Sequence, residues 1–122
     1  MSIVVKRVYD QPSADDGYRV LVDRLWPRGL SHAMAQLDLW LRDVAPSSEL
    51  RKWYDHRVER WPEFQKRYAQ ELEAHGALLD LLLDIERHRQ RLTLLFAARD
   101  RERNEAQVLA NALAHRPAHS HH

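Results

Sequence analysis

The segment VLVDRLWPRG at residues 20–29 constrains the fold most, because it is an apolar, β-branched run that ends abruptly in charged residues and a proline. Such a run is typical of a buried strand, and Pro27 cannot donate to a continuing ladder of backbone hydrogen bonds. Two further segments also cluster Arg, Asp, His or Trp at the ends of predicted elements. They are WYDHRVERW at residues 53–61 and LLFAARDRERN at residues 94–104. We expect the three segments to contribute to one site.

The rest of the chain alternates strand-like and helix-like segments. Apolar or β-branched runs predict strands, at residues 3–8, 18–25 and 92–98. Periodic apolar residues bounded by Ser, Pro or Gly predict helices, at about residues 34–43, 48–54, 62–76, 77–90 and 102–115. This order is typical of an α/β fold, a small single domain with a short, mostly parallel sheet flanked by helices. We expect the domain at residues 1–115 and a polar, His-rich, disordered tail at residues 116–122.

Composition excludes several classes of protein. The 122 residues suit one domain, and no apolar run approaches the roughly 18 residues that a membrane helix requires. The chain has no cysteine, which excludes disulfides, thiolate nucleophiles and thiolate metal sites. Its 19 basic and 18 acidic residues give a net charge of +1, so long-range attraction to nucleic acid is weak. Because no signal peptide precedes the first strand, we expect a cytoplasmic protein without membrane contact.

Polar residues follow two of the predicted strands, at the edge of a parallel sheet where ligands commonly bind. If the extended geometry of the strand persists, alternation places Arg24, Trp26 and Arg28 on one side. A guanidinium pair beside an indole suits a phosphorylated or carboxylated ligand with a planar part. The alternative is structural: Asp23 or Asp38 pairs with these arginines, and the tryptophan closes the core.

His56 is the best candidate for proton transfer, because only histidine titrates near neutrality without perturbation, and Arg60 follows one turn later. Asp100 and Asn104 lie four residues apart at a strand-to-helix junction, so both can face the sheet edge. Structural alternatives are a hydrogen-bonding role for His56 and helix capping by Asp100. We expect a small anionic ligand in a pocket at the carboxyl edge of the sheet. Its lining is predicted to be Arg24, Trp26, Arg28, His56, Arg60, Asp100 and Asn104.

An arginine-rich surface offers an alternative function, a nucleic-acid-binding or regulatory domain. Its residues would be Arg57, Arg60, Lys66, Arg67, Arg99, Arg101 and Arg103. Phosphate contacts of such a surface release counterions and make binding steeply salt-dependent. The near-zero net charge and the lack of a recognisable helix-turn-helix pattern argue against this alternative. No metal-ligand, phosphate-loop or serine-nucleophile motif occurs, so the sequence assigns no cofactor, no reaction and no oligomeric state.

Three long segments resemble the YeaO-type proteins of the DUF488 family. They are DGYRVLVDRLWPRG at residues 16–29, LWLRDVAPSSELRKWYDHRVERWPEFQKRY at residues 39–68 and TLLFAARDRERNEAQVL at residues 93–109. The resemblance implies a bacterial, cytoplasmic α/β domain and no particular reaction. Members of the family often have a Phe-Gly-His-Asp turn where this chain has Trp53, Tyr54, Asp55, His56 and Arg57. The histidine is kept but the glycine is not, which leaves the backbone shape of this turn open.

Overall fold

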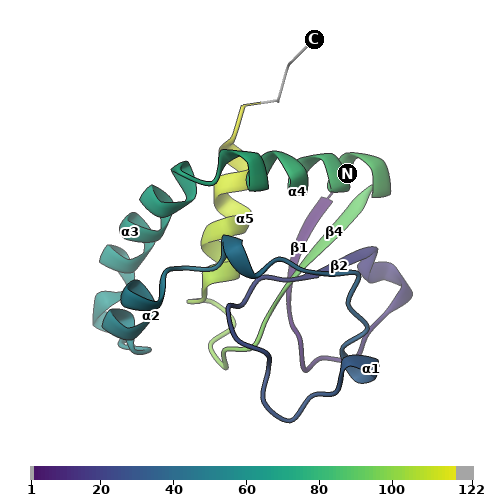
Figure 1. The fold of residues 1–122 in the computed structure, drawn as a ribbon, viewed down its shortest axis with the longest axis horizontal. Coiled ribbons are helices and arrows are strands. Elements are labelled where there is room, and N and C mark those ends of the chain that lie inside the picture. The colour runs from purple at the N-terminus through teal and green to yellow at the C-terminus, as the bar shows by residue number, and fades with distance from the viewer. Residues whose placement is uncertain (1, 118–122) are drawn as a thin grey trace.

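All strands of the sheet run parallel in the computed structural model, which describes residues 2–117 (Figure 1). The spatial order of the strands is β1-β4-β2-β3. Their bounds are Ser2–Arg7 for β1, Tyr18–Leu21 for β2, Leu39–Trp40 for β3 and Arg91–Phe96 for β4. The last strand in the sequence therefore lies between the first two. This arrangement confirms the predicted α/β fold with a short parallel sheet and helices around it.

Five α-helices connect or follow the strands among the described residues, and α2 and α3 begin at the expected sequence signals. Their bounds are His32–Ala35 for α1, Ser48–Tyr54 for α2, Trp61–Glu73 for α3, Gly76–Arg89 for α4 and Glu105–His115 for α5. The Ser47 side chain caps α2 by accepting a hydrogen bond from the Leu50 amide. Pro62 lies in the first turn of α3, where its missing N–H removes no intrahelical bond.

The two faces of the sheet have different covers. Val20 and Leu94 belong to the larger apolar core, which includes residues of α3, α4 and α5. Leu21 and Leu95, their neighbours in sequence, belong to a second, smaller core on the opposite face. The loop segments before and after α1 supply this cover, with Trp26, Leu30, Leu37 and Trp40 packed against the second core. Helices thus bury one face and a long, mostly irregular connection buries the other.

The helix predicted at residues 34–43 is wrong. α1 spans only His32–Ala35 and ends at Gln36, whose φ of 48° is left-handed. Residues 39 and 40 instead form β3, which pairs with β2. The apolar residues in this stretch are only partly periodic, so a helix there is weakly favoured. The edge of β2 offers hydrogen-bond partners to their backbone groups, which favours a strand instead. The strand predicted at residues 18–25 is also too long, because β2 ends at Leu21.

The predicted tail is described only at its start. Residues 118–122 lie outside the described part of the chain, so the prediction of disorder there stays untested. Arg116 follows α5, and its Nε donates a hydrogen bond to Asp80 on α4, 2.8 Å away.

A buried arginine joins β2 both to the residue Asp16 before it and to the end of α1. Arg19 is only 5% exposed, and its Nη1 lies 2.5 Å from Asp16 Oδ2. The other guanidinium nitrogens donate to the carbonyls of Gln36, at 2.9 Å, and Ala35, at 2.7 Å. Burial acts to raise the pKa of Asp16, but hydrogen bonds led by that from Lys6 outweigh it and lower this pKa. This stabilisation is therefore present above the ordinary aspartate pKa and is lost as the pH falls below it.

Arg19→Ala is expected to reduce the free energy of unfolding by about 3 kcal/mol, because it removes one donor from the buried Asp16 carboxylate and leaves two carbonyls without theirs. Urea denaturation at pH 7 measures this change. Arg99→Ala, which removes an exposed arginine, should change stability by less than about 0.5 kcal/mol. Equal effects of the two substitutions would contradict the role of the ion pair.

Candidate functional site

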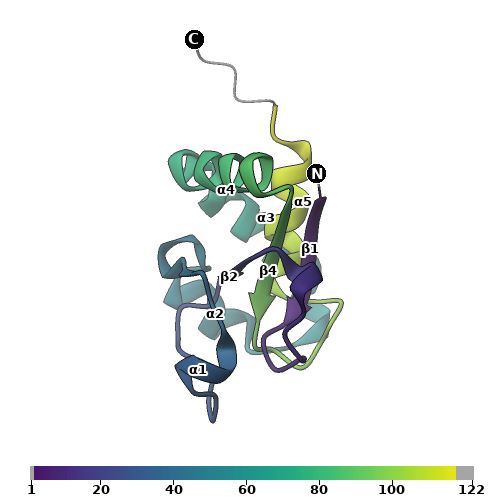
Figure 2. The ribbon, with the colours of Figure 1, turned by 90° about the vertical axis from the view of Figure 1, so that its right-hand side faces the viewer.

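Asp23 connects the strands of the sheet just beyond their carboxyl ends. Its Oδ2 accepts a hydrogen bond from the Ala97 amide at 3.0 Å, one residue after β4. Its backbone carbonyl accepts a hydrogen bond from Trp40 Nε1 at 2.7 Å. The β4 arrowhead points toward the end of the molecule where α1 lies, opposite α4 (Figure 2). This is the edge at which open parallel sheets commonly bind ligands.

A cavity of about 770 Å³ opens at this edge. Its volume falls within the range of small-molecule sites. It is lined by residues that follow β2, by α2 and the turn after it, and by the segment from the end of β4 to the start of α5. Its charged and histidine lining residues are Asp23, Arg24, Arg28, Arg51, Lys52, Asp55, His56, Arg103 and Glu105. All three polar segments singled out in the sequence contribute to this one cavity.

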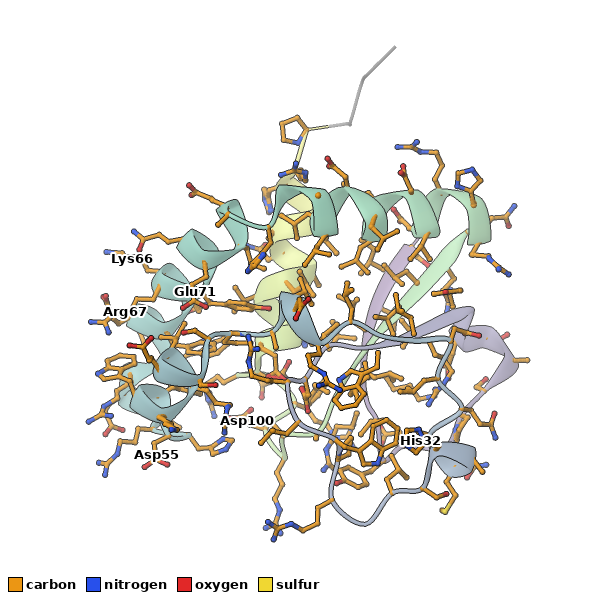
Figure 3. The ribbon with its side chains drawn as sticks, viewed as in Figure 1. His32, Asp55, Lys66, Arg67, Glu71 and Asp100 are labelled. Carbon is orange, nitrogen blue, oxygen red and sulfur yellow. The ribbon has the colours of Figure 1, made fainter. Side chains whose placement is uncertain are left out.

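Five of the seven predicted site residues line the cavity. They are Arg24, Trp26, Arg28, His56 and Asn104. Arg60 and Asp100 are not among the lining residues. Arg60 donates to the Trp53 carbonyl and lies with its guanidinium carbon 5.2 Å from the centre of that residue's ring. Asp100 accepts hydrogen bonds from the Arg103 amide and side chain, each at 2.9 Å, and it lies in the loop before α5 (Figure 3).

Arg24 and Trp26 diverge because the strand geometry that would have aligned them ends at residue 21. The Arg24 guanidinium donates to the carbonyls of Pro46, at 3.2 Å, and Ala45, at 3.3 Å, before α2. The Trp26 ring packs edge-on against Trp40, with ring centres 5.3 Å apart, on the second face of the sheet. Neither Asp23 nor Asp38 forms an ion pair with Arg24 or Arg28 among residues 2–117. Neutral carbonyls hold Arg24, so its charge stays uncompensated.

The turn after α2 presents His56 to the cavity. Asp55 has a φ of 48°, and His56 has a φ of 56°. Two consecutive left-handed residues without glycine are uncommon, and aspartate and histidine tolerate this region better than most residues. The turn in this chain is therefore left-handed without a glycine. His56 is exposed, and its ring centre lies 6.3 Å from that of Tyr54.

Asn104 has both a structural role and a place in the lining. Its side-chain oxygen caps α5 by accepting a hydrogen bond from the Gln107 amide at 3.1 Å. Its Nδ2 donates to the Asp100 carbonyl at 2.9 Å. The sequence interpretation that gave the helix cap to Asp100 is therefore wrong, because the helix begins three residues later than predicted. The amino end of α5, which favours negative charge, faces the cavity at this point.

Three exposed cations of the lining have no protein partner. The side chains of Arg28, Arg51 and Lys52 make no hydrogen bond or ion pair with any described residue. Arg51 and Lys52 were missed by sequence reasoning. Their signal was weak, since a basic pair on a short helix is usually a solvated face, but they precede His56 by only one helical turn. Unpaired cations around a concave surface attract anions.

Three carboxyl groups, those of Asp23, Asp55 and Glu105, lie among these cations. Burial raises the pKa of Glu105 well above its ordinary value, and the negative charge of Asp23 and a hydrogen bond with it raise it further. Glu105 is therefore held in its protonated, neutral form at pH values where an ordinary glutamate is ionised. Because Glu105 carries no charge at such pH values, the positive charges of the lining exceed the negative ones by more than a count of acidic residues suggests.

The sequence comparisons place the chain in a family. The model of the DUF488-N3i family, described as "Inactive DUF488-N3 subclade", matches residues 2–121. The chain belongs to this family. The "Uncharacterized protein YeaO" of Escherichia coli K12 is 44% identical over 113 residues, which cover 93% of this chain and 97% of the relative. The "Uncharacterized protein Rv3073c" of Mycobacterium tuberculosis H37Rv is 45% identical over 109 residues, with 89% and 91% covered. No solved structure matches significantly.

Several residues of the alternative arginine-rich surface of this DUF488-N3 protein are paired. Arg101 Nη1 lies 2.8 Å from Asp10 Oδ2, and Arg67 Nε lies 2.9 Å from Glu63 Oε2. Such pairing reduces the positive potential available to phosphates. Nucleic-acid binding by this surface stays an untested prediction.

None of the helices among residues 2–117 is long and apolar enough to cross a membrane. Within the same part of the chain, no group of three or more His, Asp or Glu side chains is arranged to hold a metal ion.

Glu105→Gln is expected to stabilise the DUF488-N3 protein increasingly as the pH rises. A folded-state pKa above the unfolded value means that folding takes up a proton, so stability is full below about pH 4.3 and falls as the pH rises toward the folded pKa. Glutamine removes this dependence. The melting temperature of the variant should exceed that of the unmodified protein by roughly 5 °C at pH 8, about 1 kcal/mol, and by much less at pH 5. Glu102→Gln, at an exposed position, should show no such trend.

Proposed function

We propose that this DUF488-N3 protein binds a small anionic ligand in the cavity at the carboxyl edge of its sheet. The observation that carries the proposal is the set of three exposed, unpartnered cations, Arg28, Arg51 and Lys52, around a cavity of about 770 Å³. Guanidinium groups bind phosphate and carboxylate bidentately, and an ammonium adds a further donor. The ligand would supply the carboxylate or phosphate partner that these side chains do not have within the described chain.

Three neighbouring features support an anion at this place. The Arg24 guanidinium is held only by carbonyls, so its charge adds to the field of the cavity. Asn104 and Glu105 place the amino end of α5 at the same surface, where the helix dipole favours negative charge. Glu105 opposes an anion only weakly because its raised pKa keeps it neutral. His56, on the same lining, donates to an anion from either ring nitrogen once protonated.

The proposed role is binding without turnover. The family model carries the word "inactive", and His56 has no carboxylate to orient it, because no described residue accepts a hydrogen bond from its ring. General acid–base catalysis needs a proton-transfer group held at a fixed geometry. An exposed histidine on a turn suits a ligand contact better than a catalytic base.

Loss of the cations should weaken binding of inorganic phosphate in 150 mM salt. Isothermal titration calorimetry should show about a tenfold increase in Kd for Arg28→Ala/Arg51→Ala, because about 1.4 kcal/mol, a modest value for hydrogen bonds to charged groups, corresponds to tenfold. The melting temperature should change little, because both side chains are exposed and unpaired.

The matched control is Lys66→Ala, which removes an exposed charge on the outer side of α3, well away from Asp100 and His32 (Figure 3). Its Kd should equal that of the unmodified protein. Absence of phosphate binding by the unmodified protein, or equal weakening by the control, would contradict the proposal. Binding of a short oligonucleotide that disappears in moderate salt would favour the alternative nucleic-acid surface instead.

A further inference from the structure

The Tyr54 hydroxyl is a polar group of the cavity that no described residue uses. Tyr54, the last residue of α2, is only 8% exposed and lines the cavity. Its hydroxyl makes no hydrogen bond with any of residues 2–117, yet the oxygen is not sealed from solvent. The polar atoms of buried side chains normally have partners in the protein. The small exposed part of this residue, which includes the hydroxyl oxygen, therefore borders the cavity.

Two other tyrosine hydroxyls close to this region have protein partners. The Tyr68 hydroxyl of α3 donates to the Val44 carbonyl at 2.7 Å. The Tyr9 hydroxyl, from a residue that also lines the cavity, donates to the Arg28 carbonyl at 2.7 Å. Both hydroxyls hold parts of the chain together. The Tyr54 hydroxyl has no such structural task among the described residues, so a different role has to account for it.

The Tyr54 ring is held in one position by its aromatic neighbours. It stacks on Phe64 of α3, with ring centres 4.5 Å apart and planes at 29°. The Trp61 ring centre lies 5.9 Å away. A ring fixed in this way points its hydroxyl in one direction, so a hydrogen bond to a ligand costs little conformational entropy. Burial also raises the pKa of Tyr54, so the hydroxyl keeps its proton and stays a donor.

Features that favour an anion surround this hydroxyl. Arg51 precedes Tyr54 by three residues on α2, so the two side chains are neighbours on the helix surface. The Arg51 side chain has no partner among the described residues. The amino end of α5, which Asn104 caps, lines the same cavity. A cation, a neutral donor and the positive end of a helix dipole thus border one cavity, and each of them stabilises an oxyanion.

We propose that the Tyr54 hydroxyl donates a hydrogen bond to an oxyanion of the ligand and fixes where the anionic group lies in the cavity. The inference rests on the proposed anion binding and adds the residue that positions the anion. Arg28, Arg51 and Lys52 attract anions through their charge, which acts over a distance and has little directionality. A fixed O–H group instead requires an acceptor oxygen at one distance and in one direction.

Tyr54→Phe tests the proposal, because it removes one oxygen and keeps the ring that packs against Phe64. Calorimetric titration with inorganic phosphate at pH 7 in 150 mM salt should show a Kd about tenfold higher than that of the unmodified protein, as expected for a lost hydrogen bond to a charged group. The melting temperature should change by less than about 1 °C, since the hydroxyl has no partner among the described residues.

Two other tyrosines provide matched controls. Tyr18 begins β2, at the end of the strand away from the cavity, and is not among the lining residues. Tyr18→Phe should therefore leave the Kd for phosphate unchanged. Tyr68→Phe removes a hydroxyl that the fold does use, and it should lower the melting temperature by roughly 5 °C. An equally large decrease in Tyr54→Phe would show a structural role for that hydroxyl and overturn the inference.

A spectroscopic measurement detects the proposed hydrogen bond directly. In protein labelled with carbon-13 at tyrosine Cζ, the Tyr54 signal is identified by its absence from the spectrum of Tyr54→Phe. Addition of phosphate should move this signal along the same saturation curve that calorimetry gives, because Cζ carries the donating hydroxyl. The Tyr18 signal should stay in place.

The outcomes distinguish this inference from the proposed function. If phosphate binds the unmodified protein and Tyr54→Phe with the same Kd, the inference is overturned and the three cations remain the anion site. A Tyr54 signal that does not move while phosphate saturates the protein would overturn it as well, even with weakened binding in Tyr54→Phe. If the unmodified protein does not bind phosphate, the proposed function and this inference fail together.

Discussion

The buried pair of Arg19 and Asp16 is the contact on which the rest of the molecule depends. One guanidinium holds a carboxylate before β2 and two carbonyls at the end of α1. The Arg19 guanidinium therefore attaches the end of this connection to β2. The connection has about fifteen residues, follows β2 in the sequence and has little regular structure. Just beyond this contact, residues 39 and 40 pair with β2, and Trp40 Nε1 donates to the Asp23 carbonyl. The candidate site lies beyond the carboxyl end of β2, and its position therefore depends on a contact made by Arg19 within that strand.

The sequence patterns predicted the regular parts of the fold and failed where tertiary contacts replaced periodicity. The strand at residues 91–96 and the helices α2 to α5 have strong local signals, including Ser47 as a cap and Pro62 in a first turn. The stretch after Met34 has apolar residues at irregular spacing, and its structure is decided by the Asp38 carboxylate, which accepts the Arg19 amide at 2.8 Å. That partner lies nineteen positions away. A pattern restricted to one helix or strand contains no information about it.

The sequence predicted which segments meet at the cavity more accurately than which residues line it. The expectation that polar residues at the ends of parallel strands converge brought Arg24, Arg28, His56 and Asn104 to one cavity. Glu105 was not among the predicted site residues, because its proximity to Asp23 arises only in the packed molecule. Arg60 and Asp100 have partners close in sequence, Trp53 and Arg103, which hold them away from the cavity lining. Local contacts of this kind compete with any role at a distant site.

The strand order has a consequence for synthesis of the chain. β4 pairs with both β1 and β2, yet it is the last strand in the sequence, and β1 pairs with no other described strand. A nascent chain emerging from the ribosome therefore holds β1 without a neighbour until residue 96 has been made. Such late, non-local pairing slows folding, because the entropy of closing a long loop is lost before the contacts form. The amino-terminal strand is thus an exposed, β-branched segment throughout most of translation, when chaperones have the opportunity to bind it.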